Sequence, residues 1–265
     1  MLSLTPTEVG EMPHGANLEY LVTGTGPPTT VFAHGIAGGI GDTRPLGGGV
    51  EGRKVFFQFR GHGRSDPPPT GQLTYLDLAA DLRSVADRFE ATRAVGASLG
   101  AGALCRLLAQ TPDRFDRAVF FLPAVLDEPR SAAGLSRLRS LVDAVAAEDG
   151  PATAALLAGE IPLSLRERPA SWRYVRDRLD ALMRDGLVGV ADLLSQTALP
   201  DRTALKAVTA EALVIGCRGD AAHPPEVAEQ LASLLPHATL HVYAQPAVLW
   251  TNRADLRTRI TDFLN

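Results

Sequence analysis

Short runs of apolar residues recur along the chain and alternate with stretches of helical periodicity. Most of the runs are almost continuously apolar, which is typical of strands covered on both faces of a mainly parallel sheet. We predict strands at residues 18–23, 29–33, 54–59, 93–96, 117–122, 212–216 and 239–244. The intervening periodicity predicts helices at residues 76–89, 100–110, 225–235 and 254–263. This alternation predicts an α/β fold with a doubly wound, mostly parallel sheet.

One long segment interrupts the alternation. Between Asp127 and about Val208 the pattern is helical, rich in charged residues and without a convincing strand. It separates two predicted strands by far more residues than one crossover requires. We therefore predict an α/β core formed by residues 1–126 and 209–265. Residues 127–208 are predicted to form a helical cap over the C-terminal edge of the sheet, with an ordinary run of surface helices as the alternative.

Composition narrows the class of protein further. The chain has 265 residues, of which 45% are hydrophobic and 21% charged, as in soluble globular proteins. A net charge of −4 argues against electrostatic binding to nucleic acid or to an anionic membrane. The longest apolar run, at residues 118–126, is too short to span a bilayer. We expect a small-molecule substrate and no nucleic-acid or membrane partner, while no feature indicates an oligomeric state.

The cysteines and the N-terminal residues bear on the compartment. Cys105 and Cys217 are too few for a disulfide framework, and both fall in predicted helices or strands, so we expect buried, reduced thiols. Residues 1–8 contain neither a basic region nor an apolar region of the kind that secretory signals have. We expect a cytoplasmic protein.

Ser98 is the strongest candidate for chemistry. It is the central residue of a G-x-S-x-G motif, directly after one predicted strand and before a predicted helix. A serine on such a tight turn needs small neighbours, which Gly96 and Gly100 supply, and Gly102 is expected to ease packing against a neighbouring strand. The N-terminus of the helix faces the site, so the Leu99 N–H is available to a developing oxyanion. The pattern predicts a nucleophilic serine.

Three more motifs follow strands, in a recognisable order. The second predicted strand ends in His34-Gly35 and a glycine-rich loop, and the next is followed by an R-G-x-G-x-S turn at residues 60–65. Asp220 lies in the loop after the strand at 212–216. Together with the Ser98 motif, this order resembles the α/β-hydrolase superfamily over most of the chain.

The resemblance implies roles for individual residues. Ser98 would be the nucleophile of a Ser-His-Asp triad and Asp220 its acid. The backbone N–H groups of Ile36 and Leu99 would form the oxyanion hole. Asp127, after the strand at 117–122, is the position that some superfamily members use for the acid, although a helix-capping or hinge role is the stronger interpretation for it.

The histidine of the triad has no counterpart at its usual place. The superfamily carries it in the loop after the last strand, and residues 245–252 here offer no side chain that exchanges protons near neutral pH. His223, three residues after Asp220, is an alternative base, but a histidine in an Asp-x-x-His-Pro turn more often begins a helix. The remaining histidines are expected to be structural or exposed: His14, His34, His62, His237 and His241. The sequence therefore predicts an incomplete triad with a non-standard or missing general base.

Several other polar and aromatic residues have two interpretations each. Asp42 and Arg44 follow the His34-Gly35 loop and could contact a polar substrate or form a local ion pair. Trp250 fills the space of the missing imidazole or belongs to the core. The arginines of the insert are expected to form a solvated face: Arg166, Arg168, Arg173, Arg176 and Arg178.

Three classes of function remain open. One is a small-molecule hydrolase of esters, thioesters or amides, or a related acyl transferase, that uses Ser98. Another is a non-hydrolytic enzyme such as a lyase, cyclase or dehydratase, and the third is a catalytically silent ligand-binding protein. The intact Ser98 turn favours an enzyme, and we predict a hydrolase. No metal or organic cofactor is implied, because the sequence has no Cys/His cluster with ligand spacing and no phosphate-binding G-x-x-x-x-G-K-[ST] motif.

Overall fold

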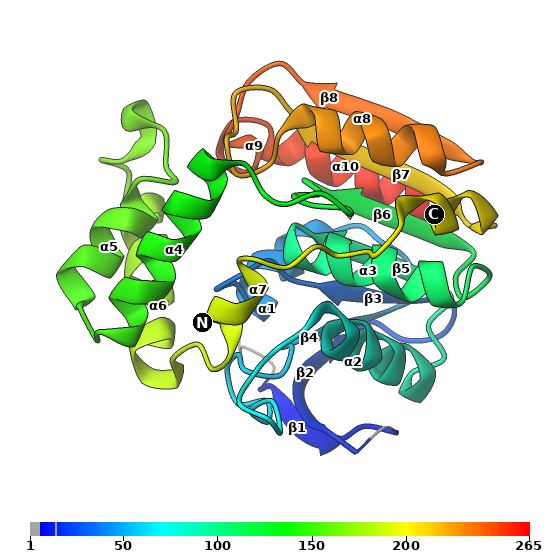
Figure 1. The fold of residues 1–265 in the computed structure, drawn as a ribbon, viewed down its shortest axis with the longest axis horizontal. Helices are drawn as coiled ribbons and strands as arrows, with labels where there is room; N and C mark the ends of the chain where they lie inside the picture. Colours follow the sequence, from blue (N-terminus) through cyan, green and yellow to red (C-terminus); the bar gives the residue numbers. More distant parts are fainter. Residues whose placement is uncertain (1–5, 14) are drawn as a thin grey trace.

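The computed structural model describes residues 6–13 and 15–265. The N-terminal residues 1–5 and His14 lie outside the described residues. Figure 1 shows one sheet running through the molecule, with helices on both of its faces and a group of helices at one side. The eight strands are, in spatial order, β1 (Glu8–Glu11), β2 (Asn17–Thr23), β4 (Arg53–Phe57), β3 (Thr29–Ala33), β5 (Arg93–Ala97), β6 (Arg117–Phe121), β7 (Glu211–Cys217) and β8 (Ala238–Tyr243).

The sheet is mostly parallel, as predicted. β4, β3, β5, β6, β7 and β8 run parallel to one another, while β2 pairs antiparallel with both β1 and β4. Each of the seven strands predicted from sequence is present. β1 was missed because its residues are mostly exposed at the edge of the sheet, and they lack the apolar run that marks the buried strands.

Successive strand residues pack into two separate core layers. On one face lie α2 (Tyr75–Arg88), α3 (Leu99–Gln110) and α8 (Pro225–Leu234), which cover residues such as Val31 and Phe120. The opposite face is covered by α1 (Ile40–Thr43), the 3-10 turn η1 (Arg44–Gly47), α9 (Val248–Thr251) and α10 (Arg253–Leu264). Phe32 and Val119, the immediate neighbours of the first pair, pack into this second layer. Because both faces are covered, the central strands are almost continuously apolar after their first one or two residues.

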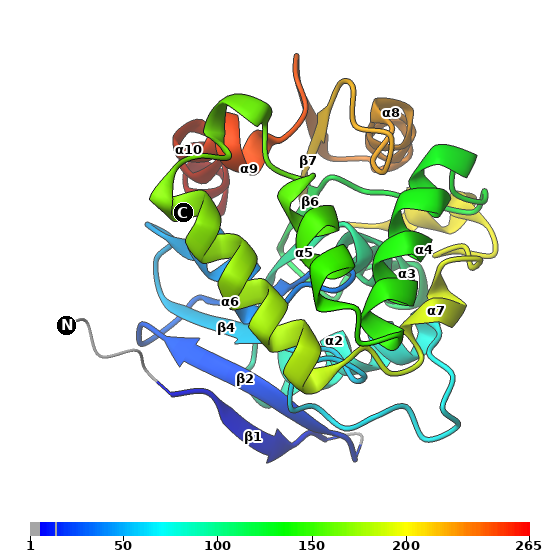
Figure 2. The ribbon, with the colours of Figure 1, turned by 90° about the vertical axis from the view of Figure 1, so that its left-hand side faces the viewer.

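The segment between β6 and β7 forms a helical insert. It contains α4 (Ala132–Ala146), α5 (Gly150–Ala158), α6 (Pro169–Asp185) and α7 (Val190–Leu193), with 3-10 turns η2 (Leu163–Leu165) and η3 (Arg202–Ala207). Figure 2 shows α4, α5 and α6 lying across one end of the sheet. The insert follows the carboxyl end of β6, so this is the end at which the parallel strands finish. The domain boundaries at residues 127 and 208 stay a prediction.

Two simpler expectations can be compared with the structure. Cys105 and Cys217 are both buried and free, in agreement with the prediction of reduced thiols. Among the described residues, no helix combines the length and the apolar composition that a membrane crossing requires.

Candidate active site

Ser98 occupies a strained turn between β5 and α3. Its φ of 51° lies in the left-handed region that residues with a side chain seldom adopt. The Ser98 N–H donates to the Phe121 carbonyl at 2.9 Å, which extends the pairing of β5 with β6 by one residue. Gly100 N–H donates to the His34 carbonyl at 3.0 Å and ties the first turn of α3 to the end of β3. On such a turn the serine side chain projects beyond the end of the strand.

Backbone crowding explains the two glycines of the motif. A Cβ on Gly96 would lie 2.5 Å from the Gly100 carbonyl oxygen, and a Cβ on Gly100 would lie well under 3.0 Å from the Ala33 carbonyl oxygen. Both obstacles are backbone atoms that cannot rotate away. Gly102 differs from the prediction, because its close neighbour is not a strand: a Cβ there would meet the Tyr75 ring of α2 at 2.6 Å.

The glycine-rich loop after β3 lies directly against Ser98. A Cβ on Gly35 would be 3.3 Å from Ser98 Cβ, so a side chain at this position would press on the serine. Ile36 and Leu99, the two predicted oxyanion donors, are both buried. Within residues 6–13 and 15–265, no hydrogen-bond acceptor is recorded for either N–H group. Both N–H groups therefore remain candidate oxyanion donors.

His34 supports this loop from below and takes no part in proton transfer at neutral pH. Its Nε2 accepts the Phe59 N–H at 3.1 Å, so its Nδ1–H is the donor to the Gly35 carbonyl at 2.8 Å. The ring is completely buried. Burial lowers the pKa of His34 to about 4, which keeps the ring neutral. This is the structural role expected for it.

Asp220 and His223 share a tight turn after β7. The His223 N–H donates to the Asp220 carbonyl at 3.2 Å, and Asp220 Oδ1 accepts the Ala222 N–H at 2.9 Å. The turn leaves Asp220 Oδ2 facing the imidazole. Burial alone raises the pKa of Asp220, but the hydrogen bond and charge of His223, the Ala222 N–H and the charge of Arg137 hold it below its usual range. The carboxylate is therefore ionised at neutral pH.

The His223 imidazole lies between Ser98 and Asp220. Its Nδ1 is 2.9 Å from Asp220 Oδ2, and its Nε2 is 2.9 Å from Ser98 Oγ. With the carboxylate accepting from Nδ1–H, the lone pair on Nε2 faces the serine hydroxyl. The prediction of a missing base is therefore contradicted, whereas the alternative of a non-standard base at His223 agrees with this geometry. The stronger interpretation of His223 as a helix start is not supported, since α8 begins at Pro225 and has no side-chain cap among the described residues.

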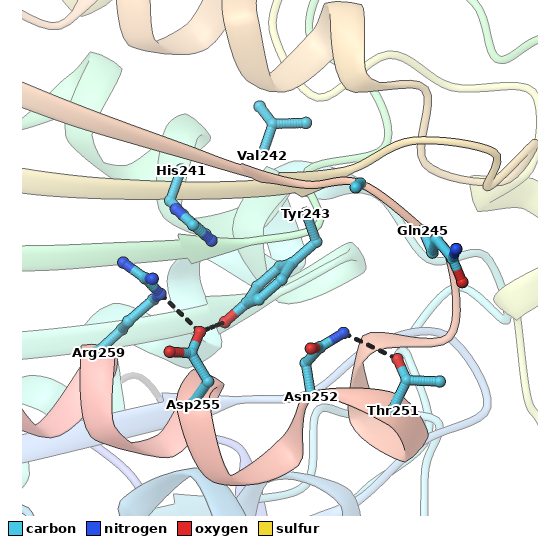
Figure 3. A pocket seen from close by; sticks show the side chains of 9 residues that line it. His241, Val242, Tyr243, Gln245, Thr251, Asn252, Asp255 and Arg259 are labelled. Atoms are coloured by element: carbon cyan, nitrogen blue, oxygen red, sulfur yellow. Dashed lines mark hydrogen bonds and ion pairs between the residues drawn. The ribbon is translucent and has the colours of Figure 1, made fainter.

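The loop after β8 contains α9 and lies beside a pocket. An open pocket of about 500 Å³ is lined by Gln245, Thr251 and Asn252 together with residues of β8 and α10. Figure 3 shows Asp255 between Tyr243 and Arg259 in this pocket, at 2.7 Å from each. None of the triad residues lines it. Residues 245–252 therefore contain no histidine, and the pocket beside them does not include Ser98.

The insert contacts the loop after β3 through a buried arginine. Arg178 of α6 is only 15% exposed, and its Nη1 lies 3.3 Å from Asp42 Oδ1 and 3.8 Å from Glu160 Oε2. The expectation of a uniformly solvated arginine face is therefore wrong at this position, and Asp42 pairs across to the insert instead of with Arg44. Asp42 Oδ2 in turn accepts the Gly39 N–H at 2.9 Å, which fixes the end of the loop.

The remaining candidates have structural partners. Asp127 pairs with Arg202 at the end of the insert and also accepts the Arg202 N–H at 3.1 Å. Trp250 packs edge-to-face on Tyr174 of α6, with ring centroids 5.1 Å apart. In the described part of the chain, no group of three or more His, Cys, Asp or Glu side chains is arranged to hold a metal ion.

Comparison with known proteins agrees with this arrangement of strands and turns. Residues 28–247 match the sequence model of the alpha/beta hydrolase fold. That match covers most of the chain, and the chain belongs to this family. No protein of curated function matches the sequence significantly.

Solved structures share the fold over nearly the whole chain. A bromoperoxidase from Bacillus anthracis has a TM-score of 0.78 at 18% identity, with 98% of this chain and 99% of that chain covered. An esterase from Exiguobacterium antarcticum has 0.76 at 16%, covering 97% and 98%. A hydrolase from Pseudomonas aeruginosa PA01 has 0.75 at 24%, covering 98% of each chain. At these identities the likeness concerns the fold.

Proposed function

We propose that this protein is a serine hydrolase that cleaves small-molecule carboxylic esters through Ser98, His223 and Asp220. The observation that carries the proposal is the position of the His223 ring, which is within hydrogen-bond distance of both Ser98 Oγ and Asp220 Oδ2. A nucleophile that contacts a base, which in turn is oriented by an acid, is the arrangement that activates serine near neutral pH.

Acylation follows from this geometry. His223 Nε2 accepts the Ser98 hydroxyl proton as Oγ attacks the ester carbonyl carbon. The negative charge that develops on the carbonyl oxygen is stabilised by the Ile36 and Leu99 N–H groups. Asp220 holds the ring and stabilises the imidazolium. His223 then gives its proton to the departing alkoxide, so that the alcohol leaves and an acyl-serine remains.

Deacylation uses the same groups in reverse. Water loses a proton to His223 Nε2 and attacks the acyl-serine carbonyl, and the oxyanion is held by the same two N–H groups. The proton returns from His223 to Ser98 Oγ as the carboxylic acid is released. A thioester or an amide would pass through the same acyl-serine. We favour the ester as substrate because esterases are among the proteins that share this fold over nearly their whole length.

The proposal is tested by labelling and by turnover of a short-chain p-nitrophenyl ester. A fluorophosphonate reagent should label the wild-type protein at Ser98 and should not label Ser98→Ala. We expect kcat to fall by about 10⁴-fold or more in Ser98→Ala and in His223→Ala, and by about 10⁴-fold in Asp220→Asn, which removes the acid.

Two exposed residues provide matched controls. Ser233→Ala and His237→Ala alter the same residue types on the surface, and both variants should keep wild-type labelling and turnover. If the wild-type protein is not labelled at Ser98, the hydrolase proposal is wrong, and a non-hydrolytic or silent protein becomes the better interpretation. Full turnover in His223→Ala would show that His223 is not the base.

A further inference from the structure

We infer that the first turns of α4, in the helical insert, position the loop that holds Asp220 and His223, with Gly134 and Ser131 as positioning residues. This inference rests on the proposed function, because it concerns the same acid and base. It assigns a catalytic consequence to a helix whose sequence carries no catalytic motif.

Ser131 connects the start of α4 to the acid–base loop. It is the N-cap of the helix, and its Oγ accepts the Gly134 N–H at 3.1 Å. The same hydroxyl donates to the Ala221 carbonyl, also at 3.1 Å. One side chain therefore caps the helix and holds the backbone between Asp220 and His223.

Gly134 sets the separation between the helix and the loop. A Cβ at this position would lie 2.8 Å from the Ala221 carbonyl oxygen and 3.2 Å from Ala222 Cα. Both atoms belong to the backbone of the loop, so a side chain could be accommodated only if helix and loop moved apart. The absence of a side chain here lets α4 rest directly on the two residues that separate the acid from the base.

Arg137 adds a positive charge near the start of α4. Residues 131, 134 and 137 are spaced by three and therefore share one face of the helix. The positive charge of Arg137 acts on the Asp220 carboxylate. α4 thus faces the acid–base loop with a hydrogen-bond donor, a close backbone contact and a cation.

The position of the loop matters because the triad spans only two segments. Asp220 and His223 move as one turn, so a shift of that turn changes the His223 Nε2 to Ser98 Oγ distance without disturbing the distance between Asp220 and His223. Displacements of about 1 Å in a catalytic group can cost roughly 100-fold in rate. A contact that fixes the turn therefore controls the step in which Ser98 loses its proton.

The central test is Gly134→Ala. We expect kcat for p-nitrophenyl ester hydrolysis and the rate of fluorophosphonate labelling to fall together by roughly 10- to 100-fold. KM should stay within about twofold, because the base acts in the transition state and not in ground-state binding. The matched control is Gly150→Ala in α5, where an added Cβ would find only Met183 Sδ, at 4.0 Å. The control should keep the wild-type rate.

A second pair of variants covers the case in which Gly134→Ala does not fold. Ser131→Ala removes both the cap of α4 and the hydrogen bond to Ala221. Asp149→Ala removes only the cap of α5, where the Asp149 side chain accepts the Ala152 N–H at 2.9 Å. We expect a comparable loss of thermal stability in the two variants and a loss of kcat in Ser131→Ala alone. Equal rates in the two variants, or a wild-type rate in folded Gly134→Ala, would overturn the inference.

The NMR signals of the His223 ring separate a failure of this inference from a failure of the proposed function. Its imidazole ¹⁵N and ¹H shifts report the hydrogen bonds to Ser98 and Asp220 whether or not an ester is turned over. Gly134→Ala should change these shifts, and Gly150→Ala should not. An unlabelled, inactive wild-type protein would reject the hydrolase proposal, while unchanged His223 shifts in Gly134→Ala would reject the positioning role.

Discussion

His223 and Asp220 occupy one turn, which makes the geometry of a few backbone atoms decisive. The Ala222 N–H bonds one oxygen of Asp220, and the other oxygen faces the imidazole. Pro225 is the first residue of α8, a position for which the fixed φ of proline is suited. Local hydrogen bonds thus fix the position of Asp220 relative to His223. Ser98 lies in a separate segment, the turn between β5 and α3.

The Ser98 turn requires that Gly100 carry no side chain. We expect Gly100→Ala to lower the free energy of unfolding by about 1–3 kcal/mol, because the added Cβ must push on the Ala33 carbonyl. The same push would disturb the bond from Gly100 N–H to the His34 carbonyl, so kcat should fall as well. Urea unfolding followed by circular dichroism measures the first effect and ester hydrolysis the second.

Gly41→Ala is the control for this substitution. An added Cβ at Gly41 would find no atom within 4 Å, so stability and turnover should be unchanged or slightly improved. A Gly100→Ala variant as stable and as active as Gly41→Ala would contradict the crowding argument.

At the scale of elements, several polar contacts join the insert to the core, and the contact made by Arg178 was not predicted from the sequence. Arg178 alone among the insert arginines lies near Asp42 and Glu160, with most of its side chain covered. Burial lowers its pKa, but the charges of Asp42 and Glu160 outweigh this and leave the pKa raised, so the group stays charged. Its contact with Asp42 reaches the loop that carries Ile36.

We expect Arg178→Met to lower the free energy of unfolding by about 2 kcal/mol, between the values for exposed and buried ion pairs, because Asp42 and Glu160 are each partly exposed. Urea unfolding is the measurement. Arg176→Met is the control on the same helix, since Arg176 is 67% exposed and its one ion pair among the described residues is with its neighbour Asp177. In Arg178→Met combined with Asp42→Asn, part of the loss should be recovered. Equal stability of the two arginine variants would contradict the assignment.

The sequence predicts an element well when the residues that determine it are close together in the chain. The central strands and the four helices α2, α3, α8 and α10 were predicted because burial on both faces, or on one helical face, leaves an apolar pattern that is local in the chain. The Ser98 turn was predicted because its G-x-S-x-G motif and the flanking strand and helix are contiguous in the chain, although the carbonyl that crowds Gly100 belongs to the distant Ala33. Edge strand β1 leaves no such pattern.

His223, the proposed base, was named from the sequence only as an alternative, for a different reason. The spacing between Asp220 and His223 is visible in the sequence, but the direction of the imidazole depends on a turn and on the distant Ser98. The family resemblance also directed attention to residues 245–252. The three-residue spacing from Asp220, with two prolines directly after His223, is also typical of a helix start, so it did not by itself favour His223 as a base.

At the scale of the whole molecule, the core contains two neutral histidines beneath the site. The rings of His34 and His62 lie edge-to-face with centroids 4.8 Å apart, and both are nearly inaccessible to solvent. Burial is the main cause of a lowered pKa in each, to about 4 for His34 and about 3 for His62, and the nearby charge of Arg178 adds to it. Neither ring gains a proton in the folded protein near neutral pH.

These two groups predict destabilisation in mild acid. The unfolded chain binds a proton at each histidine as the pH falls below 6.5, whereas the folded protein does not do so until about pH 4 or lower. The free energy of unfolding is therefore unaffected by these two groups above pH 6.5 and decreases as the pH falls below it. The decrease is about 2 kcal/mol per histidine at pH 5. Urea unfolding at pH 7.5 and pH 5.0 measures the loss. In His62→Gln the difference between the two pH values should shrink by about 2 kcal/mol, and in His237→Gln, which alters an exposed histidine, it should remain. An unchanged difference in His62→Gln would show that this buried ring does not control the acid response.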